Sequence, residues 1–143
     1  MTFLIYESGS RSPEMRHEIG EATADPVVFI EHERRRILAG PQLEADVFAA
    51  REDVVDEYWT WPELGIDELI ADESMPAHMF GAELTLRALQ RLGVERVVVP
   101  PSLHVLVADR LRAGGIALEV DAEAWSLRRR RKSPWELEGS ERA

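Results

Sequence analysis

The sequence predicts an α/β domain with a mixed β-sheet flanked by helices, and two observations lead to this fold class. The second half of the chain alternates helical and strand patterns with short connections, which is typical of parallel strands joined by right-handed crossovers. The first half contains two strand patterns around a tight charged turn, which is typical of an antiparallel hairpin. With 143 residues, 45% of them apolar, the chain is large enough for one domain with its own core.

The second half gives the clearest local signals. Apolar residues recur at helical spacing up to Leu92, and Gly93 follows as a helix stop. A continuous apolar run then ends at Pro100, and Ser102 is placed to cap the next helix. We therefore expect helices at 79–92 and 102–113 and strands at 94–99 and 116–120, with the two strands parallel.

The first half is expected to be more antiparallel. Ser12, Pro13 and Glu14 form the start signal of a short helical turn. Strands at 27–31 and 35–39, separated by three charged residues, predict a hairpin. The remaining expected elements are strands at 3–6 and 54–55 and helices at 43–51 and 66–72.

Composition excludes several classes of function. The chain has no cysteine, so disulfides, zinc–thiolate sites and thiol catalysis are excluded. The N-terminus lacks a signal-sequence pattern, and no apolar run approaches the ~20 residues that span a bilayer. The net charge is −10, and the segment 44–73 holds eleven acidic residues against the single base Arg51. We expect a cytoplasmic protein with no membrane and no nucleic-acid partner, because phosphate contacts need a basic face.

A basic run at 128–132 leads into a helix start signal at the C-terminal end. Ser133, Pro134 and Glu136 occupy the N-cap, N1 and N3 positions, so the serine and the glutamate can satisfy each other's backbone amides. Few apolar residues follow, and such a helix needs a partner to pack against. We therefore expect a domain at 1–127 and a junction at 128–143 that leads into a domain beyond Ala143.

Known catalytic templates are missing from the sequence. It contains no phosphate-binding glycine loop, and neither His17 nor His32 has a second histidine at metal-site spacing. We assign no catalytic and no metal-binding residue. The aromatic cluster Tyr58, Trp59 and Trp61 is the one candidate contact site. It fits equally well as core under the sheet and as an exposed loop in which one tryptophan packs and the other projects toward a partner or ligand.

The C-terminal stretch resembles the domain junction of the creatinase, prolidase and aminopeptidase P family. In that family a small N-terminal domain ends in an R-x-x-K-S-P-x-E-[IL] signature. The matching residues here are Arg129, Lys132, Ser133, Pro134 and Glu136. The resemblance extends to the N-terminal half, where Arg16 and Gly20 match the family's N-I-R-Y-L-T-G segment and the hairpin at 27–39 matches the paired strands that follow it.

The resemblance implies a ribonuclease-H-like fold and a non-catalytic role in oligomerisation and active-site access. The chemistry would lie in a C-terminal domain beyond Ala143, where two Asp, one His and two Glu hold two divalent metals, manganese or cobalt, for hydrolysis of Xaa-Pro bonds. Trp59 and Leu64-Gly65 fit the W-x-x-x-x-L-G spacing of members whose tryptophan reaches a neighbouring subunit. The expected partners are therefore the chain's own catalytic domain and further copies of itself.

Two alternatives remain open at the level of sequence. The chain can be a stand-alone α/β interaction or regulatory domain without a peptidase partner. It can also be the N-terminal domain of a creatinase-like enzyme that hydrolyses a non-peptide substrate, or of an inactive relative.

Overall fold

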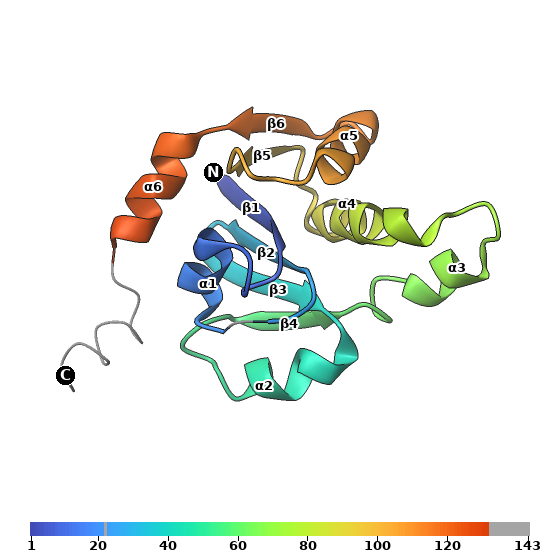
Figure 1. The fold of residues 1–143 in the computed structure, drawn as a ribbon, viewed down its shortest axis with the longest axis horizontal. Helices are drawn as coiled ribbons and strands as arrows, with labels where there is room; N and C mark the ends of the chain where they lie inside the picture. Colours follow the sequence, from blue (N-terminus) through green and yellow to red (C-terminus); the bar gives the residue numbers. More distant parts are fainter. Residues whose placement is uncertain (22, 132–143) are drawn as a thin grey trace.

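The computed structural model describes residues 1–21 and 23–131, which form a mixed β-sheet with helices on both faces (Figure 1). The sheet has six strands in the order β4-β3-β2-β1-β5-β6. The strands are β1 (Thr2–Glu7), β2 (Val27–His32), β3 (Arg35–Gly40), β4 (Glu57–Thr60), β5 (Arg96–Val99) and β6 (Ala117–Val120). The predicted fold class is thereby confirmed.

Strand directions follow from the connections. β2 pairs antiparallel with both β1 and β3, whereas the β1–β5, β5–β6 and β3–β4 pairs are parallel. Five strands therefore run in one direction and β2 runs against them. The parallel pair β5–β6 is joined through a helix, as the alternating pattern of the second half predicts.

The helices divide between the two faces of the sheet. They are α1 (Pro13–Ile19), α2 (Ala45–Ala49), α3 (Ile66–Ala71), α4 (Phe80–Leu92), α5 (Val105–Ala113) and α6 (Ala122–Arg130), with short 3-10 turns at Gln42–Glu44 and Ala77–Met79. Helices α3, α4 and α5 contribute to one buried cluster, and α1, α2 and α6 contribute to the other (Figure 1).

Side chains that alternate between the two faces of each strand produce these two buried clusters. Leu4 on β1 lies in the cluster under α4 and α5, and its neighbour Ile5 lies in the cluster under α1 and α6. Successive strand residues point to opposite faces, so a central strand covered on both sides is apolar at every position. Val27, Val28, Phe29 and Ile30 of β2 are all fully buried.

The hairpin between β2 and β3 has an unusual turn. His32 pairs with Arg35, so only Glu33 and Arg34 form the loop, and their φ angles are +51° and +69°. A two-residue loop with positive φ at both positions normally carries Asn or Gly, because a Cβ is crowded there. The predicted hairpin is confirmed, and its tight turn is held by the ladder of buried pairs rather than by favourable turn residues.

Several predicted elements are confirmed with small shifts of their ends. Ser12 caps α1, accepting a hydrogen bond from the Met15 amide at 3.1 Å. Helix α4 ends at Leu92, and Gly93 follows in the left-handed conformation that the stop signal requires. Helix α3 matches the predicted segment 66–72 except at its last residue.

The strand expected at 54–55 is wrong, and two predicted helices are present with different bounds. Val54 and Val55 form a buried turn, and the strand next to β3 is Glu57–Thr60, because these residues pair with the free edge of β3. The helix expected at 43–51 consists of a 3-10 turn followed by the short α2. The helix expected to start at Ser102 starts instead at Val105 with His104 as its N-cap.

The C-terminal part of the described chain is helix α6, which the sequence interpretation did not identify. It spans the expected boundary between residues 127 and 128 and ends at Arg130. The helix start expected at Ser133, Pro134 and Glu136, together with Lys132, lies outside the described residues. Within residues 1–21 and 23–131, no helix has both the length and the apolar character needed to cross a bilayer.

Candidate functional site

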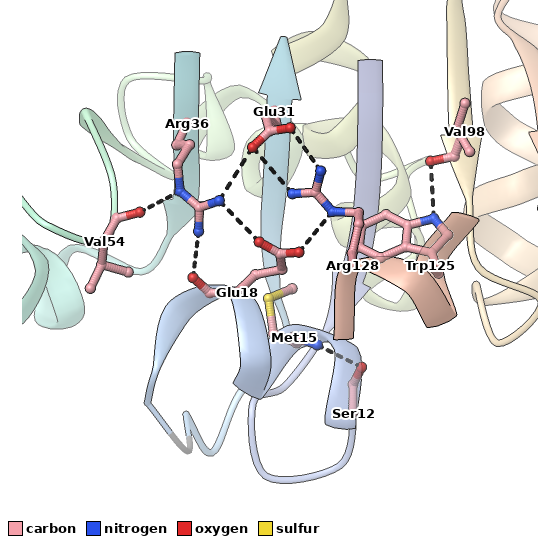
Figure 2. Close-up of polar contacts among 9 residues, drawn as sticks. All are labelled: Ser12, Met15, Glu18, Glu31, Arg36, Val54, Val98, Trp125 and Arg128. Carbon is pink, nitrogen blue, oxygen red and sulfur yellow. Dashed lines mark hydrogen bonds and ion pairs between the residues drawn. The ribbon is translucent and has the colours of Figure 1, made fainter. Parts of the chain in front are cut away.

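Helix α6, the last element of the described residues, places two side chains against the sheet. Asp121 caps the helix by accepting a hydrogen bond from the Ala124 amide at 2.9 Å. Trp125 and Arg128 are three residues apart, so they lie on the same face of the helix. Figure 2 shows both side chains directed at the neighbouring strands and at α1.

Trp125 anchors the first half of α6. Its ring is only 1% exposed and packs edge-on against Phe3, with ring centroids 5.4 Å apart. The indole nitrogen donates to the Val98 carbonyl at 3.3 Å (Figure 2). Burying a tryptophan with its N–H satisfied is one of the larger apolar contributions that a single side chain can make.

Arg128 anchors the second half through two carboxylates. Its Nε donates to Glu18 Oε1 on α1 at 2.8 Å, and its Nη1 and Nη2 donate to Glu31 on β2 at 2.8 and 3.2 Å (Figure 2). The guanidinium also lies over the Phe3 ring, 4.3 Å from its centroid. Two-pronged arginine–carboxylate pairs fix geometry as well as charge.

A second arginine, Arg36 on β3, completes the arrangement. It donates to Glu18 Oε2 at 3.0 Å and to Glu31 Oε1 at 3.3 Å, and its other nitrogens donate to the carbonyls of Glu18 and Val54 (Figure 2). We name Glu18, Glu31, Arg36 and Arg128 the α6 docking cluster. Two carboxylates face two guanidiniums, so the cluster is neutral overall.

Burial makes this cluster consequential for stability. The side chains of Glu18 and Arg128 are only 4% and 17% exposed. Burial opposes the charged form of Glu31, but the hydrogen bond from Arg128 and the charges of Arg128 and Arg36 outweigh it and hold the pKa of Glu31 below its ordinary value. Burial likewise opposes the charge of Arg128, yet its bonds to both carboxylates raise its pKa.

The α6 docking cluster fits a structural task better than a chemical one. Each guanidinium is already engaged by the two carboxylates, and the cluster ties α1, β2, β3 and α6 together. It therefore fixes the position of α6 relative to α1, β2 and β3. Arg129, the first residue of the junction signature, also contacts α1 but is more exposed: its side chain is 46% exposed and pairs with Glu14 at 3.3 Å.

The aromatic residues of β4 lie on both faces of the sheet. Trp59 is 4% exposed and belongs to the buried cluster under α4. The Arg91 guanidinium lies over its ring, 4.4 Å from the ring centroid. Tyr58 packs on the opposite face, stacked on Phe48 with centroids 5.6 Å apart. Its hydroxyl donates to the Pro41 carbonyl at 2.6 Å, and burial followed by the nearby Glu44 charge raises its pKa.

Trp61 lies on the same face as Trp59 and is partly exposed. The expectation that the two tryptophans face opposite ways is wrong, because residues two apart on an extended strand point to the same side. Leu64, the other apolar member of the W-x-x-x-x-L-G spacing, is buried in the same cluster as Trp59. A contact with substrate or a neighbouring subunit remains a prediction for these aromatics, and Trp61 is the more accessible tryptophan.

The sequence interpretation missed the residues that dock α6. The sequence analysis places Glu31 at the end of the strand 27–31, next to a charged turn, and does not predict that its carboxylate binds both arginines. The sequence analysis places Arg128 in a basic run and not on a helix that docks against the sheet. One signal was present: Asp121 followed by residues with good helix propensity and by Trp125 predicts a capped amphipathic helix.

Two further observations concern the chemistry available in residues 1–21 and 23–131. Within those ranges, no group of three or more His, Cys, Asp or Glu side chains is arranged to hold a metal ion. His104 pairs with Glu7 at 2.5 Å, and His32 is hydrogen-bonded to Thr2 at 2.8 Å. No protein-family model matches the chain, and no curated protein matches it significantly.

Proposed function

We propose that this chain is the non-catalytic N-terminal domain of a metallopeptidase-like protein of the creatinase, prolidase and aminopeptidase P type. In this proposal the domain adopts the ribonuclease-H-like variant of its mixed sheet and serves oligomerisation and access to the active site. The junction signature that begins at Arg129 motivates the family assignment.

The observation that carries the proposal is the docking of α6. A domain that positions a neighbour needs a rigid exit, and here the exit helix is fixed by Trp125 at one end and by Arg128 at the other. The signature residues Arg129 to Glu136 begin on this fixed helix. The docking cluster thus provides the rigid support that a domain junction requires.

The aromatic strand β4 supplies the second element of the proposal. Trp61 is partly exposed, close in sequence to the buried Trp59, and its amide donates to the Gly40 carbonyl at 2.8 Å, which ties the start of the loop after β4 to the end of β3. Tryptophan is enriched at protein contacts because it combines a large apolar area with a polar edge. We propose that Trp61 and Tyr58 contribute to the contact with a second subunit.

The proposed chemistry belongs to the partner domain. There, two Asp, one His and two Glu would hold two manganese or cobalt ions, and the metals would supply a bound hydroxide for attack on a Xaa-Pro bond. No residue of the present chain takes part in that step. The lack of cysteine fits the cytoplasmic location that we propose for the whole protein.

An activity comparison tests this proposal. The isolated chain and the full-length protein are each incubated with manganese and a Xaa-Pro dipeptide, and release of proline is measured. Only the full-length protein is expected to hydrolyse the dipeptide, and a chelator should abolish that hydrolysis. Hydrolysis by the isolated chain would contradict the non-catalytic role, and inactivity of the full-length protein would contradict a peptidase parent.

A further inference from the structure

A hollow of about 560 Å³ lies between the loop that follows β1, helix α1 and the end of α6. Three arginines and one histidine line it: Arg11, Arg16, Arg129 and His17. Among the described residues, 1–21 and 23–131, no aspartate or glutamate lines it, although the chain as a whole carries a net charge of −10. Positively charged side chains are therefore concentrated at this hollow, although the protein as a whole is negatively charged.

Two of the arginines are available to a ligand. Arg11 and Arg16 are exposed, and within the described ranges they make no hydrogen bond or salt bridge through their side chains. The neighbouring carboxylates are engaged elsewhere: Glu18 binds Arg128, and Glu21 binds Arg51 at 2.7 Å. Glu7, whose charge interacts with that of Arg11, is paired with His104. Arginine side chains left unpaired in a concave site are the usual means of binding oxyanions.

The third arginine is held at the rim. Arg129 pairs with Glu14 at 3.3 Å, and Glu14 in turn accepts from the Ser12 hydroxyl at 3.2 Å. This carboxylate reduces the positive charge of the site but also fixes the position of Arg129. A single Glu14–Arg129 nitrogen contact leaves the other guanidinium N–H groups able to donate to a ligand.

Hydrogen bonds and one close backbone contact hold the wall of the hollow together. The Gly9 amide donates to Thr23 Oγ1 at 2.8 Å, and the Ser10 amide donates to the Thr23 carbonyl at 3.2 Å. A Cβ on Gly9 would lie 2.0 Å from the Glu21 carbonyl oxygen, so only glycine permits this close approach of two backbone segments. A preorganised wall reduces the ordering cost of binding.

We propose that this hollow binds a small multivalent oxyanion, a phosphate ester or a polycarboxylate. Arg11 and Arg16 supply exposed guanidinium groups that form no salt bridge within the described ranges, and Arg129 and His17 also line the hollow. The site does not depend on the proposed function, because it is formed entirely by residues of this chain. It lies at the base of the junction segment, so bound anion would contact the exit helix through Arg129.

Titration of the chain with pyrophosphate and with succinate, followed by backbone amide NMR, tests the proposal. We expect saturable shifts of the Gly9, Ser10 and Gly20 amides. The double variant R11Q/R16Q should weaken binding by about tenfold or more, because hydrogen bonds to charged groups are strong. The matched control R112Q removes an exposed arginine on α5, outside the hollow, and should change the affinity by less than about twofold.

The two probes distinguish the sources of the anion. Tighter binding of pyrophosphate assigns the site to phosphate esters, and tighter binding of succinate assigns it to dicarboxylates. Equal weakening by R11Q/R16Q and by R112Q would reveal general charge attraction and overturn the proposal. The absence of saturable shifts with either probe would overturn it as well.

Discussion

Replacing Arg128 by methionine tests whether the α6 docking cluster holds the exit helix. Methionine retains an apolar stem of similar length, so the substitution mainly removes the charge and its three hydrogen bonds. Glu18 and Glu31 would then share the single positive charge of Arg36. Removing one partner of a buried ion pair costs about 3–5 kcal/mol.

The structure sets the expected cost near the lower end of that range. Arg128 is 17% exposed and Glu31 is 24% exposed, so water can partly solvate the remaining charge. We expect R128M to lower the free energy of unfolding by about 3 kcal/mol. Urea denaturation followed by tryptophan fluorescence should show a lower midpoint with an unchanged slope.

A double-mutant cycle separates two causes of the lost stability: the unbalanced charge of the remaining carboxylates and the lost packing of the Arg128 side chain. In E31Q/R128M one carboxylate and one guanidinium are removed together, so Glu18 and Arg36 remain as a balanced pair. The double variant should be more stable than the sum of the two single changes predicts, by about 1–3 kcal/mol. The control R112M changes an exposed arginine and should stay within about 0.5 kcal/mol of the original protein. A similarly small effect of R128M would refute the docking role.

Three further results are expected. Because the pKa of Glu31 is lowered in the folded state, the ionised Glu31 side chain stabilises the fold fully above about pH 4.3, and this stabilisation is lost as pH falls through the folded-state pKa. The free energy of unfolding of E31Q should therefore depend less on pH in this acidic range than that of the original protein. In urea denaturation, W59A should lower the free energy of unfolding by about 3–5 kcal/mol because the Trp59 ring lies in the core, whereas W61A should lower it clearly less because Trp61 is partly exposed. Equal losses in the two variants would contradict the different burial of the two rings. Placing Asn-Gly at Glu33 and Arg34 should raise the melting temperature, since both positions have positive φ, and an unchanged or lower value would contradict the strained turn.

Local signals account for the elements that the sequence predicts well. Helix α4 carries an amphipathic pattern with a glycine stop, and α1 carries a serine cap followed by proline. These signals lie within a few residues of the structure they specify. The strand predicted at 54–55 lies instead at Glu57–Thr60, because the position of β4 depends on pairing with the free edge of β3, where Trp59 pairs with Ala39, and not on local apolar content.

The candidate site depends on long-range contacts and could not be predicted in the same way. Glu18 and Arg128 are separated by 110 residues, and Glu31 and Arg128 by 97. In sequence, Glu31 lies in a run of charged residues that is typical of a solvated turn. Only the pairing of β1 with β2 and the packing of α6 bring these groups together.

The coding sequence that follows Ala143 tests the central claim most directly. The account predicts that the reading frame stays open and encodes a second domain with the two Asp, one His and two Glu ligands of a dinuclear metal site. A stop codon immediately after Ala143 in the native gene would contradict it, because the docked helix would then lead to no catalytic domain.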